Sequence, residues 1–275
     1  MVKWCENTGN NSMIVCLDQE KAYDRIDLNY LWRALEAFSF PNLFIQRVRN
    51  LYRNALTAIC INGFLSEHFD MRRGVHQGDP MSCLLYNLAI KLLIENIQES
   101  MLRGFQVNTE LERDLVKVYV DDVTIFLGPE DKPKEMQACL DLFCNASMAH
   151  FNSQKAEIIP VGTREFHSEL TRTREFNGWT IEEEIHIVKD REATRILGLW
   201  QGNGTSTQMK WNKIMERQAK TMRLWSLMYP SITGRILVVK ALVISLAYYL
   251  MTVNGIPWDT LSDMEKNIPA FIWSG

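Results

Sequence analysis

The chain has 275 residues and a formal net charge of −3 at pH 7. This length allows one large domain or two ordinary ones, with a core that needs no disulfide or structural metal. The hydrophobic share of 47% and charged share of 23% lie near globular averages, which excludes a disordered chain and a fibrous repeat. The net negative charge also means that the chain as a whole lacks the basic character typical of nucleic-acid-binding proteins.

The cysteines and histidines form no recognisable metal or disulfide pattern. No CxxC pair occurs and the histidines are scattered, so we expect reduced, buried thiols. The N-terminal segment has neither a signal-peptide core nor an Arg-rich amphipathic character. We therefore expect an intracellular protein, and the sequence does not distinguish nucleus from cytoplasm or fix the oligomeric state. The cysteines are Cys5, Cys16, Cys60, Cys83, Cys139 and Cys144.

The first elements predicted are a strand that ends on a carboxylate and two helices. Residues 13–17, MIVCL, are apolar and stop at Asp18, which is typical of a buried strand. Asp27 can cap the next helix by accepting hydrogen bonds from its first-turn amides, and Pro41 suits the first turn of a second helix. The expected apolar faces are Leu28, Leu31, Leu35 and Phe38, then Leu43, Phe44, Val48 and Leu51.

A hairpin and a long helix are predicted next. Residues 57–61 and 64–69 flank an Asn-Gly pair, which is a strong signal for a two-residue hairpin turn. After the glycine-containing loop at 72–80, apolar residues at helical spacing predict a helix from Met81 to about Glu99. Its expected apolar positions are Leu84, Leu85, Leu88, Leu92 and Ile97.

Two strands are predicted around the sequence YVDD at 119–122. They cover residues 115–120 and 123–127, so both aspartates are expected in the tight turn of a hairpin, where neither side chain need be buried. A helix over about 134–149 and a strand over 157–161 should follow. The soft boundary is the polar cluster at 201–207, after which only helices are expected.

Asp18 and Asp121 are candidates for a metal-dependent centre. Nucleotidyl transfer needs an activated 3′-hydroxyl and a pyrophosphate whose charge is neutralised, and two divalent ions held by carboxylates supply both. Carboxylate oxygens are hard ligands that suit magnesium. The alternative is that the Asp pair is ordinary turn chemistry and that Asp18 is a helix cap or an exposed side chain.

Five sequence blocks, taken together and in order, favour the catalytic interpretation. They are DQEKAYD at 18–24, RRGVHQGDPMSCLLYNLA at 72–89, YVDD at 119–122, NSQKAE at 152–157 and ILGLWQG at 196–202. This series resembles the successive palm motifs of reverse transcriptases, and it is most similar to those of non-long-terminal-repeat, LINE-type retrotransposons. The resemblance extends from about Ile14 to Gly275.

The resemblance implies roles for individual residues. Asp18 and Asp121 match the two principal metal ligands, and Asp122 matches the third carboxylate of a site for two Mg²⁺ or Mn²⁺ ions. Tyr23 matches the aromatic residue that stacks beneath the incoming sugar and excludes a ribose 2′-hydroxyl. Lys155 matches a lysine near the triphosphate that could neutralise or protonate the departing pyrophosphate; otherwise it is a solvated surface lysine.

Three further positions match the family in contacts with substrate strands. Gln77 and Gly78 match the loop that approaches the nascent base pair and the template, although Gly78 alone would indicate only a turn before a helix. Gly198 and its neighbours match the primer grip.

The implied fold class is α+β. A polymerase palm, an antiparallel sheet with packed helices, is expected over residues 1–204, followed by an all-α, thumb-like region over 205–275. Only seventeen residues precede Asp18, so the fingers subdomain is expected to be missing. The implied partners are an RNA template, a DNA primer or duplex, and deoxynucleoside triphosphates.

The helix expected from Gln208 has one basic and one apolar side. The basic side, which could follow the phosphates of a duplex, consists of Lys210, Lys213, Arg217 and Lys220. The opposite side carries Trp211, Ile214, Met215, Met222 and Trp225. A merely solvated basic face is the alternative.

The apolar run at 236–253 is close to membrane-spanning length but contains Lys240 near its start. We expect a buried thumb helix here and no membrane; a small membrane-anchored protein is the alternative.

The chain departs from the family pattern at three positions. His76 stands where a basic residue is commoner, Cys83 where proline is usual, and Lys91 where an acid often appears. None of them removes a metal ligand. A catalytically inactive nucleic-acid-binding remnant, an intron maturase and a viral RNA polymerase remain alternatives, and Tyr23 argues against the last because an RNA polymerase must accept ribose.

Overall fold

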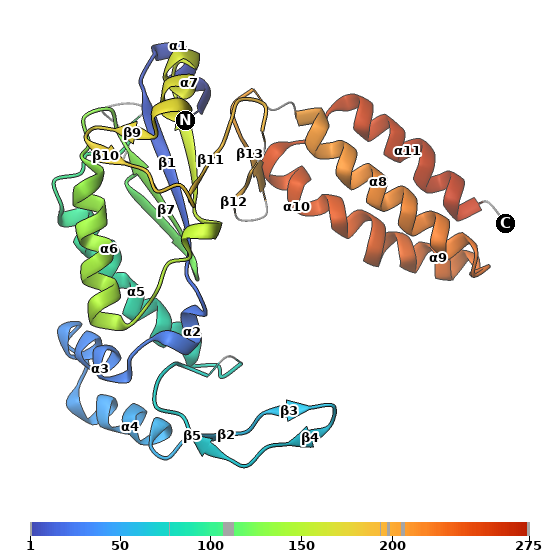
Figure 1. Ribbon diagram of the computed structural model, residues 1–275. Coiled ribbons are helices and arrows are strands. Elements are labelled where there is room, and N and C mark those ends of the chain that lie inside the picture. Colours follow the sequence, from blue (N-terminus) through green and yellow to red (C-terminus); the bar gives the residue numbers. More distant parts are fainter. Residues whose placement is uncertain are drawn as a thin grey trace. The chain divides into compact units, whose positions relative to one another are not determined.

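The computed structural model describes residues 2–76, 78–106, 113–192, 194–196, 199–204 and 207–273. They belong to two compact units, Met1–Lys189 and Asp190–Gly275 (Figure 1). The division falls after Lys189, so a short hairpin before the helices belongs to the second unit.

A five-stranded sheet forms the centre of the first unit. Its strand order is β11-β8-β1-β7-β6, and the central strand β1 is antiparallel to both of its neighbours. Only the pairing of β11 with β8 is parallel within this sheet. The predicted antiparallel sheet is therefore confirmed except at this edge. The strands are β1 (Ser12–Asp18), β6 (Val116–Tyr119), β7 (Asp122–Leu127), β8 (Glu157–Val161) and β11 (His186–Ile187).

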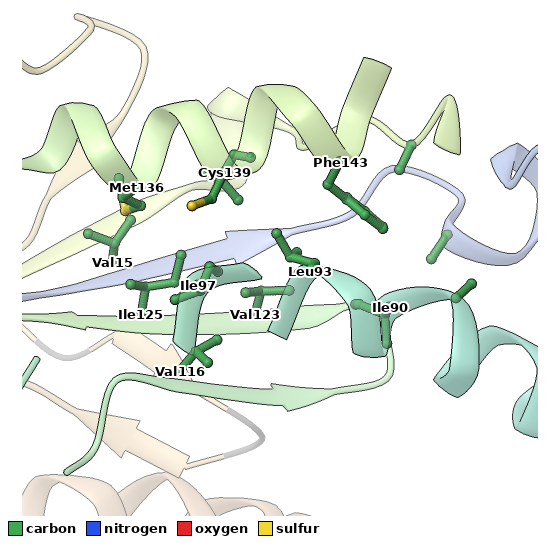
Figure 2. Packing of buried hydrophobic residues seen from close by; sticks show 14 of the residues in the cluster. Val15, Ile90, Leu93, Ile97, Val116, Val123, Ile125, Met136, Cys139 and Phe143 are labelled. Carbon is green, nitrogen blue, oxygen red and sulfur yellow. The ribbon is translucent and has the colours of Figure 1, made fainter. Parts of the chain in front are cut away.

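Helices α5 (Ser82–Glu99) and α6 (Pro133–Ser147) lie side by side along this sheet (Figure 1). Alternate residues of β1 and β7, such as Val15 and its register partner Ile125, point toward them because successive strand side chains face opposite ways. Figure 2 shows these two side chains with Leu93 of α5 and Met136 of α6 in one cluster, and all four are buried. This packing fixes the sheet at the end where β1 stops.

Two helices follow the first strand, as predicted, but only one has the expected apolar face. Helix α3 (Leu28–Ala37) is capped by Asp27, whose carboxylate accepts a hydrogen bond from the Tyr30 amide, and it buries Leu31 and Leu35. Helix α4 (Asn42–Tyr52) buries Val48 as expected, but its other buried residues are Ile45 and Tyr52. The prediction was wrong for Leu43, Phe44 and Leu51, which are exposed. The side of the helix that faces the core is the one with Ile45, Val48 and Tyr52.

The predicted hairpin is confirmed as two short ladders. Strands β2 (Leu56–Thr57) and β5 (Phe69–Asp70) pair at its base, and β3 (Cys60–Ile61) and β4 (Phe64–Leu65) pair at its tip (Figure 1). Asn62 and Gly63 form the turn with positive φ values, which fits the twist of a two-residue hairpin.

Helix α5 begins and ends as predicted, but its buried face is rotated. Leu85 and Ile97 are buried as expected, while Leu84 is exposed, and Tyr86 and Leu93 lie in the core. The expected buried thiols are also only partly confirmed. Cys5 and Cys139 are buried, whereas Cys60 and Cys83 are exposed. None of the six cysteines forms a disulfide.

The remaining elements of the first unit are short. They are α1 (Val2–Thr8), α2 (Ala22–Arg25), the 3₁₀ turn η1 (Ser153–Lys155), α7 (Arg164–Thr173) and the hairpin of β9 (Glu175–Phe176) with β10 (Trp179–Thr180).

The second unit is helical after its first hairpin, as predicted. Trp211 is fully buried with Ala247, Leu250 and Met264, while Val238, Val239, Val243 and Phe271 form a second cluster. The hairpin is β12 (Thr194–Ile196) with β13 (Leu199–Gln201). The helices are α8 (Thr207–Ser226), α9 (Ile232–Val238), the π-helical turn η2 (Val239–Ile244), α10 (Ser245–Asn254) and α11 (Trp258–Trp273).

The continuous helix Ile232–Val253 passes a test of length and apolar composition for crossing a membrane. Only 28% of its most apolar window is buried. The expectation of a buried helix therefore holds for a minority of its side chains, among them Val243 and Ala247. A soluble protein's core helix passes the same test, so this is weak evidence for a membrane.

Candidate active site

The backbone brings the three predicted carboxylate residues together. Asp18 ends β1, and its register partner on β7 is Asp122. The amide of Gln19 donates a hydrogen bond to the carbonyl of Asp121, with N and O 3.1 Å apart. The three aspartates therefore lie at one end of two directly paired strands.

The prediction that both aspartates of YVDD occupy the turn was wrong for one of them. Tyr119 pairs with Asp122, so only Val120 and Asp121 form the turn and Asp122 begins the strand. Val120 has φ of 56°, which is unusual for a β-branched residue because its branched side chain crowds the backbone there. The turn that presents Asp121 is therefore strained.

The three carboxylates and the Lys155 ammonium affect the pKa values of Asp122 and of Lys155. Burial raises the pKa of the Asp122 carboxyl, and the charges of Asp121 and then Asp18 raise it further. The Lys155 ammonium opposes this rise. Its Nζ donates a hydrogen bond of 2.9 Å to Oδ2 of Asp18, and this bond raises the pKa of Lys155. The structure thus brings Lys155 to the carboxylates.

The three carboxylates are suitable ligands for a hard divalent cation, but their side chains are not arranged around a common point. Three carboxylates within mutual electrostatic reach, one with a raised pKa, need positive charge nearby. Among the described residues, however, no three His, Cys, Asp or Glu side chains are placed to hold an ion together. Oδ2 of Asp18 accepts the hydrogen bond from Lys155, so this oxygen would have to give up that bond to serve as a metal ligand.

Tyr23 is linked to the end of β1 through a second tyrosine, Tyr86. Its ring stacks on that of Tyr86 with centroids 4.9 Å apart and planes 25° apart. Tyr86 is fully buried and its hydroxyl donates a hydrogen bond of 2.5 Å to Oε1 of Gln19. Burial, and then the charge of Asp121, raises the pKa of the Tyr86 hydroxyl. The predicted sugar-selecting residue thus stacks on a side chain that is bonded to Gln19, the neighbour of Asp18.

The loop at 72–80 is fastened to the segment that carries Tyr23. The amide of Val75 donates to the Tyr23 carbonyl at 2.7 Å, and that of Gly74 donates to the Ile26 carbonyl at 2.8 Å. Gly74 has φ of 86°, and a Cβ there would lie 2.7 Å from the Asp24 carbonyl oxygen. Only glycine allows the two segments to approach this closely.

The other predicted positions fall partly outside the described residues. Gly78 has φ of 100° and open space where a Cβ would be, so a ligand could approach its backbone. Gln77 and Gly198 lie outside the described residues, and so does the side chain of Lys210.

The basic face of α8 is confirmed where its side chains are described. Lys213, Arg217 and Lys220 are exposed, while Trp211 on the opposite side is fully buried. Trp225 was expected on the packed side but is 39% exposed. The packed side therefore ends before the last turn of the helix.

Sequence reasoning missed four residues that shape this site: Gln19, Gly74, Tyr86 and Val120. Each lies inside or next to a block already singled out, but its importance depends on a contact across the chain. Gln19 and Tyr86 are 67 residues apart and bond to each other. No local spacing predicts that bond.

Comparison with protein families and curated proteins agrees with this geometry. The family model described as reverse transcriptase (RNA-dependent DNA polymerase) matches residues 2–200. An uncharacterized 149 kDa protein of transposon TX1 from Xenopus laevis is 25% identical over 291 residues, covering 100% of this chain and 20% of that protein. A retrovirus-related Pol polyprotein from the type-2 retrotransposable element R2DM of Drosophila melanogaster is 31% identical over 113 residues, covering 41% of this chain and 10% of that protein.

A solved structure of telomerase from Candida Tropicalis, in complex with a TWJ fragment of telomeric RNA, aligns with a TM-score of 0.44 at 15% identity. The alignment covers 94% of this chain and 40% of that one. The chain spans about a fifth or less of the length of the curated relatives described above.

Proposed function

The chain belongs to the reverse transcriptase (RNA-dependent DNA polymerase) family, in the group carried by non-long-terminal-repeat retrotransposons, and on this premise we propose that it performs template-directed deoxynucleotidyl transfer. The observation that carries the proposal is the pairing of β1 with β7, which sets Asp18 opposite Asp122 with Asp121 in the adjoining turn. The proposed partners are an RNA template, a DNA primer and deoxynucleoside triphosphates.

Asp18, Asp121 and Asp122 are the residues proposed to hold two divalent ions, Mg²⁺ or Mn²⁺. Such ions supply activation of the primer 3′-hydroxyl and neutralisation of the pyrophosphate. The chain's own contribution is a fixed backbone: β1 and β7 are hydrogen-bonded to each other, and the Gln19 amide ties the Asp121 carbonyl to the end of β1. This backbone places the three residues in advance, and their carboxylates would turn onto the ions when these bind.

Lys155 is proposed to move between two anionic partners. Its side chain is 62% exposed and held only by Asp18 in the contacts described above, so it can turn toward a triphosphate without leaving a buried cavity. There the ammonium would neutralise the leaving pyrophosphate or give it a proton. Tyr23 is proposed to lie beneath the incoming sugar, because its ring stacks on that of Tyr86, whose hydroxyl is bonded to Gln19 directly after Asp18.

A palm over 1–204 and a thumb over 205–275 are proposed to share the work, so the proposed palm includes the first unit and the β12–β13 hairpin of the second. Lys213, Arg217 and Lys220 project from one side of α8 and are proposed to follow the phosphates of the template and primer, together with Lys210. Gln77, Gly78 and Gly198 are proposed to contact the nascent base pair and the primer.

Primer extension on an RNA template in the presence of Mg²⁺ tests the proposal. We expect extension by the parent chain and a loss of about a hundredfold or more in Asp121→Asn, because removal of a charge-stabilising group from such sites costs at least that much. Asp141→Asn is the matched control, since Asp141 is an exposed acid on α6. Equal extension by the parent chain and Asp121→Asn would rule out the proposed metal site.

The side-chain arrangement favours one second candidate, a nucleic-acid-binding chain without turnover. In the described residues the three carboxylates do not converge as a ligand group, and one of them is bound to Lys155. This candidate predicts tight binding of an RNA–DNA duplex without any extension at saturating duplex, nucleotide and Mn²⁺. Extension above background by the purified chain would exclude it.

A further inference from the structure

The contact between Tyr23 and Cys83 has no counterpart in the roles described so far. The Tyr23 hydroxyl donates a hydrogen bond to the Sγ atom of Cys83 at 3.4 Å. The two residues are sixty positions apart and come from different motif blocks. Because the family pattern noted above has proline at the position of Cys83, and a proline side chain cannot accept this bond, the contact belongs to this chain.

The stack on Tyr86 fixes only part of the position of the Tyr23 ring. Tyr86 is immobile, since it is fully buried and bonded to Gln19. An offset aromatic stack holds two ring planes nearly parallel, but it tolerates sliding because its energy varies gently with offset. A second restraint, at the ring's edge, is needed to fix how far Tyr23 reaches over its neighbour.

Cys83 is well placed to supply that restraint. It is the second residue of α5, two and three residues before Leu85 and Tyr86, both of which anchor this turn in the core. The backbone of Tyr23 is held by the Val75 amide at 2.7 Å. Tyr23 is therefore restrained at three points: its backbone, the face of its ring and its hydroxyl. Only the restraint at the hydroxyl depends on an exposed side chain, that of Cys83.

We infer that Cys83 is a positioning residue for sugar discrimination, whose sulfur fixes the Tyr23 ring at the place where a ribose 2′-hydroxyl would collide with it. This inference rests on the proposed function, because it assigns Tyr23 to the incoming sugar. Loss of the sulfur leaves the stack intact and lets the ring slide. Ribose is then tolerated better, while deoxyribose, which never touches the ring edge, is bound as before.

Dissociation constants for a deoxynucleotide and the matching ribonucleotide provide the test, measured by equilibrium dialysis on the full chain with template, Mg²⁺ and a primer that lacks a 3′-hydroxyl and so cannot be extended. Cys83→Ala is expected to lower the preference for the deoxynucleotide about two- to tenfold, the range that one net hydrogen bond supports. Cys83→Ser, which keeps an acceptor, should restore most of it. Cys60→Ala is the matched control, because Cys60 is also exposed but lies on the β3–β4 hairpin.

Alkylation of the thiols by iodoacetamide, followed by mass spectrometry, gives a readout that needs no turnover. A bound deoxynucleotide should slow alkylation of Cys83 and leave that of Cys60 unchanged, since only Cys83 touches the proposed sugar site. If the deoxynucleotide binds while the preference of Cys83→Ala equals that of the parent, the inference is wrong and the proposed function stands. If no deoxynucleotide binds to the parent chain, the proposed function fails and the inference with it.

Discussion

The surroundings of Asp122 disfavour the charged form of its carboxyl. Its pKa is raised by burial and by the charges of Asp121 and Asp18. The folded chain therefore binds the Asp122 proton more tightly than the unfolded chain does. This favours folding below the ordinary carboxyl pKa, and the advantage is lost as pH rises through the raised value.

Asp122→Asn should therefore stabilise the metal-free chain at pH 7. With EDTA present, we expect a rise in Tm of about 2 °C, a size typical of one unfavourable charge in a chain of this length. The gain should shrink as pH falls through the raised pKa, because the carboxyl of the parent chain is then also neutral. Thermal unfolding by circular dichroism at several pH values measures this, with Asp141→Asn as the control; a gain independent of pH would contradict the electrostatic cause.

Val120 provides a second prediction at the same scale. Asparagine tolerates the left-handed backbone region that strains valine at φ of 56°. Val120→Asn should raise the free energy of unfolding by about 0.5 to 1 kcal/mol, measured by urea denaturation. Val118→Asn, two residues earlier in the extended strand β6, should lower it, because asparagine is unfavourable in strands. The same sign for both variants would show that the turn is not strained.

Among the elements, the loop at 72–80 and helix α2 are joined through one glycine. Gly74 and Gly63 both have φ of 86°, but a Cβ would meet the backbone of Asp24 at Gly74 and nothing within 4 Å at Gly63. Gly63→Ala should cost about 1 kcal/mol of unfolding free energy for its backbone conformation alone. Gly74→Ala should cost roughly 2 to 4 kcal/mol, since the joined segments must also separate. Equal losses in urea denaturation would show that the close approach is unimportant.

Most elements were predictable from the sequence because their signals are local. The apolar run before Asp18, the capping Asp27 and the Asn-Gly turn each specify their own conformation, and the structure has all three. The buried face of α4 was predictable only in part. Val48 is buried as expected, but apolar residues surround much of the helix, and its contacts with the rest of the unit select Ile45 over Leu43 and Leu51.

The candidate site likewise has residues that local sequence predicts and contacts that it does not. Asp18, Tyr23 and Lys155 stand in recognisable blocks; the structure bonds Lys155 to Asp18 and links Tyr23 through Tyr86 to Gln19, the residue after Asp18. The hydrogen bonds of Gln19 with Tyr86 and of Tyr23 with Cys83 span more than fifty residues, so they follow from the packing of α5 against the sheet and from no sequence pattern. The register that places Asp122 in the strand instead of the turn likewise depends on the pairing of β7 with β1.

For the whole molecule, the proposed binding of a polyanion must be reconciled with a net charge of −3. The acids of the first unit include the proposed metal ligands, whose charge bound cations would offset. The exposed cations of α8, by contrast, form a local stripe on the second unit. Affinity for a duplex should therefore depend on that stripe and not on the net charge, because counterion release counts only the phosphates that are contacted.

The salt dependence of duplex binding tests this directly. Each neutralised phosphate contributes roughly 0.7 to 0.9 to the slope of log K against log salt concentration. Replacement of Lys213, Arg217 and Lys220 by alanine should thus reduce the slope for an RNA–DNA duplex by about 2 to 3, measured by fluorescence anisotropy. Replacement of three exposed cations of the first unit, Lys134, Arg164 and Arg172, removes the same charge and should change the slope by less than about 1. Equal reductions in the two triple variants would mean that net charge, and not the face of α8, governs binding.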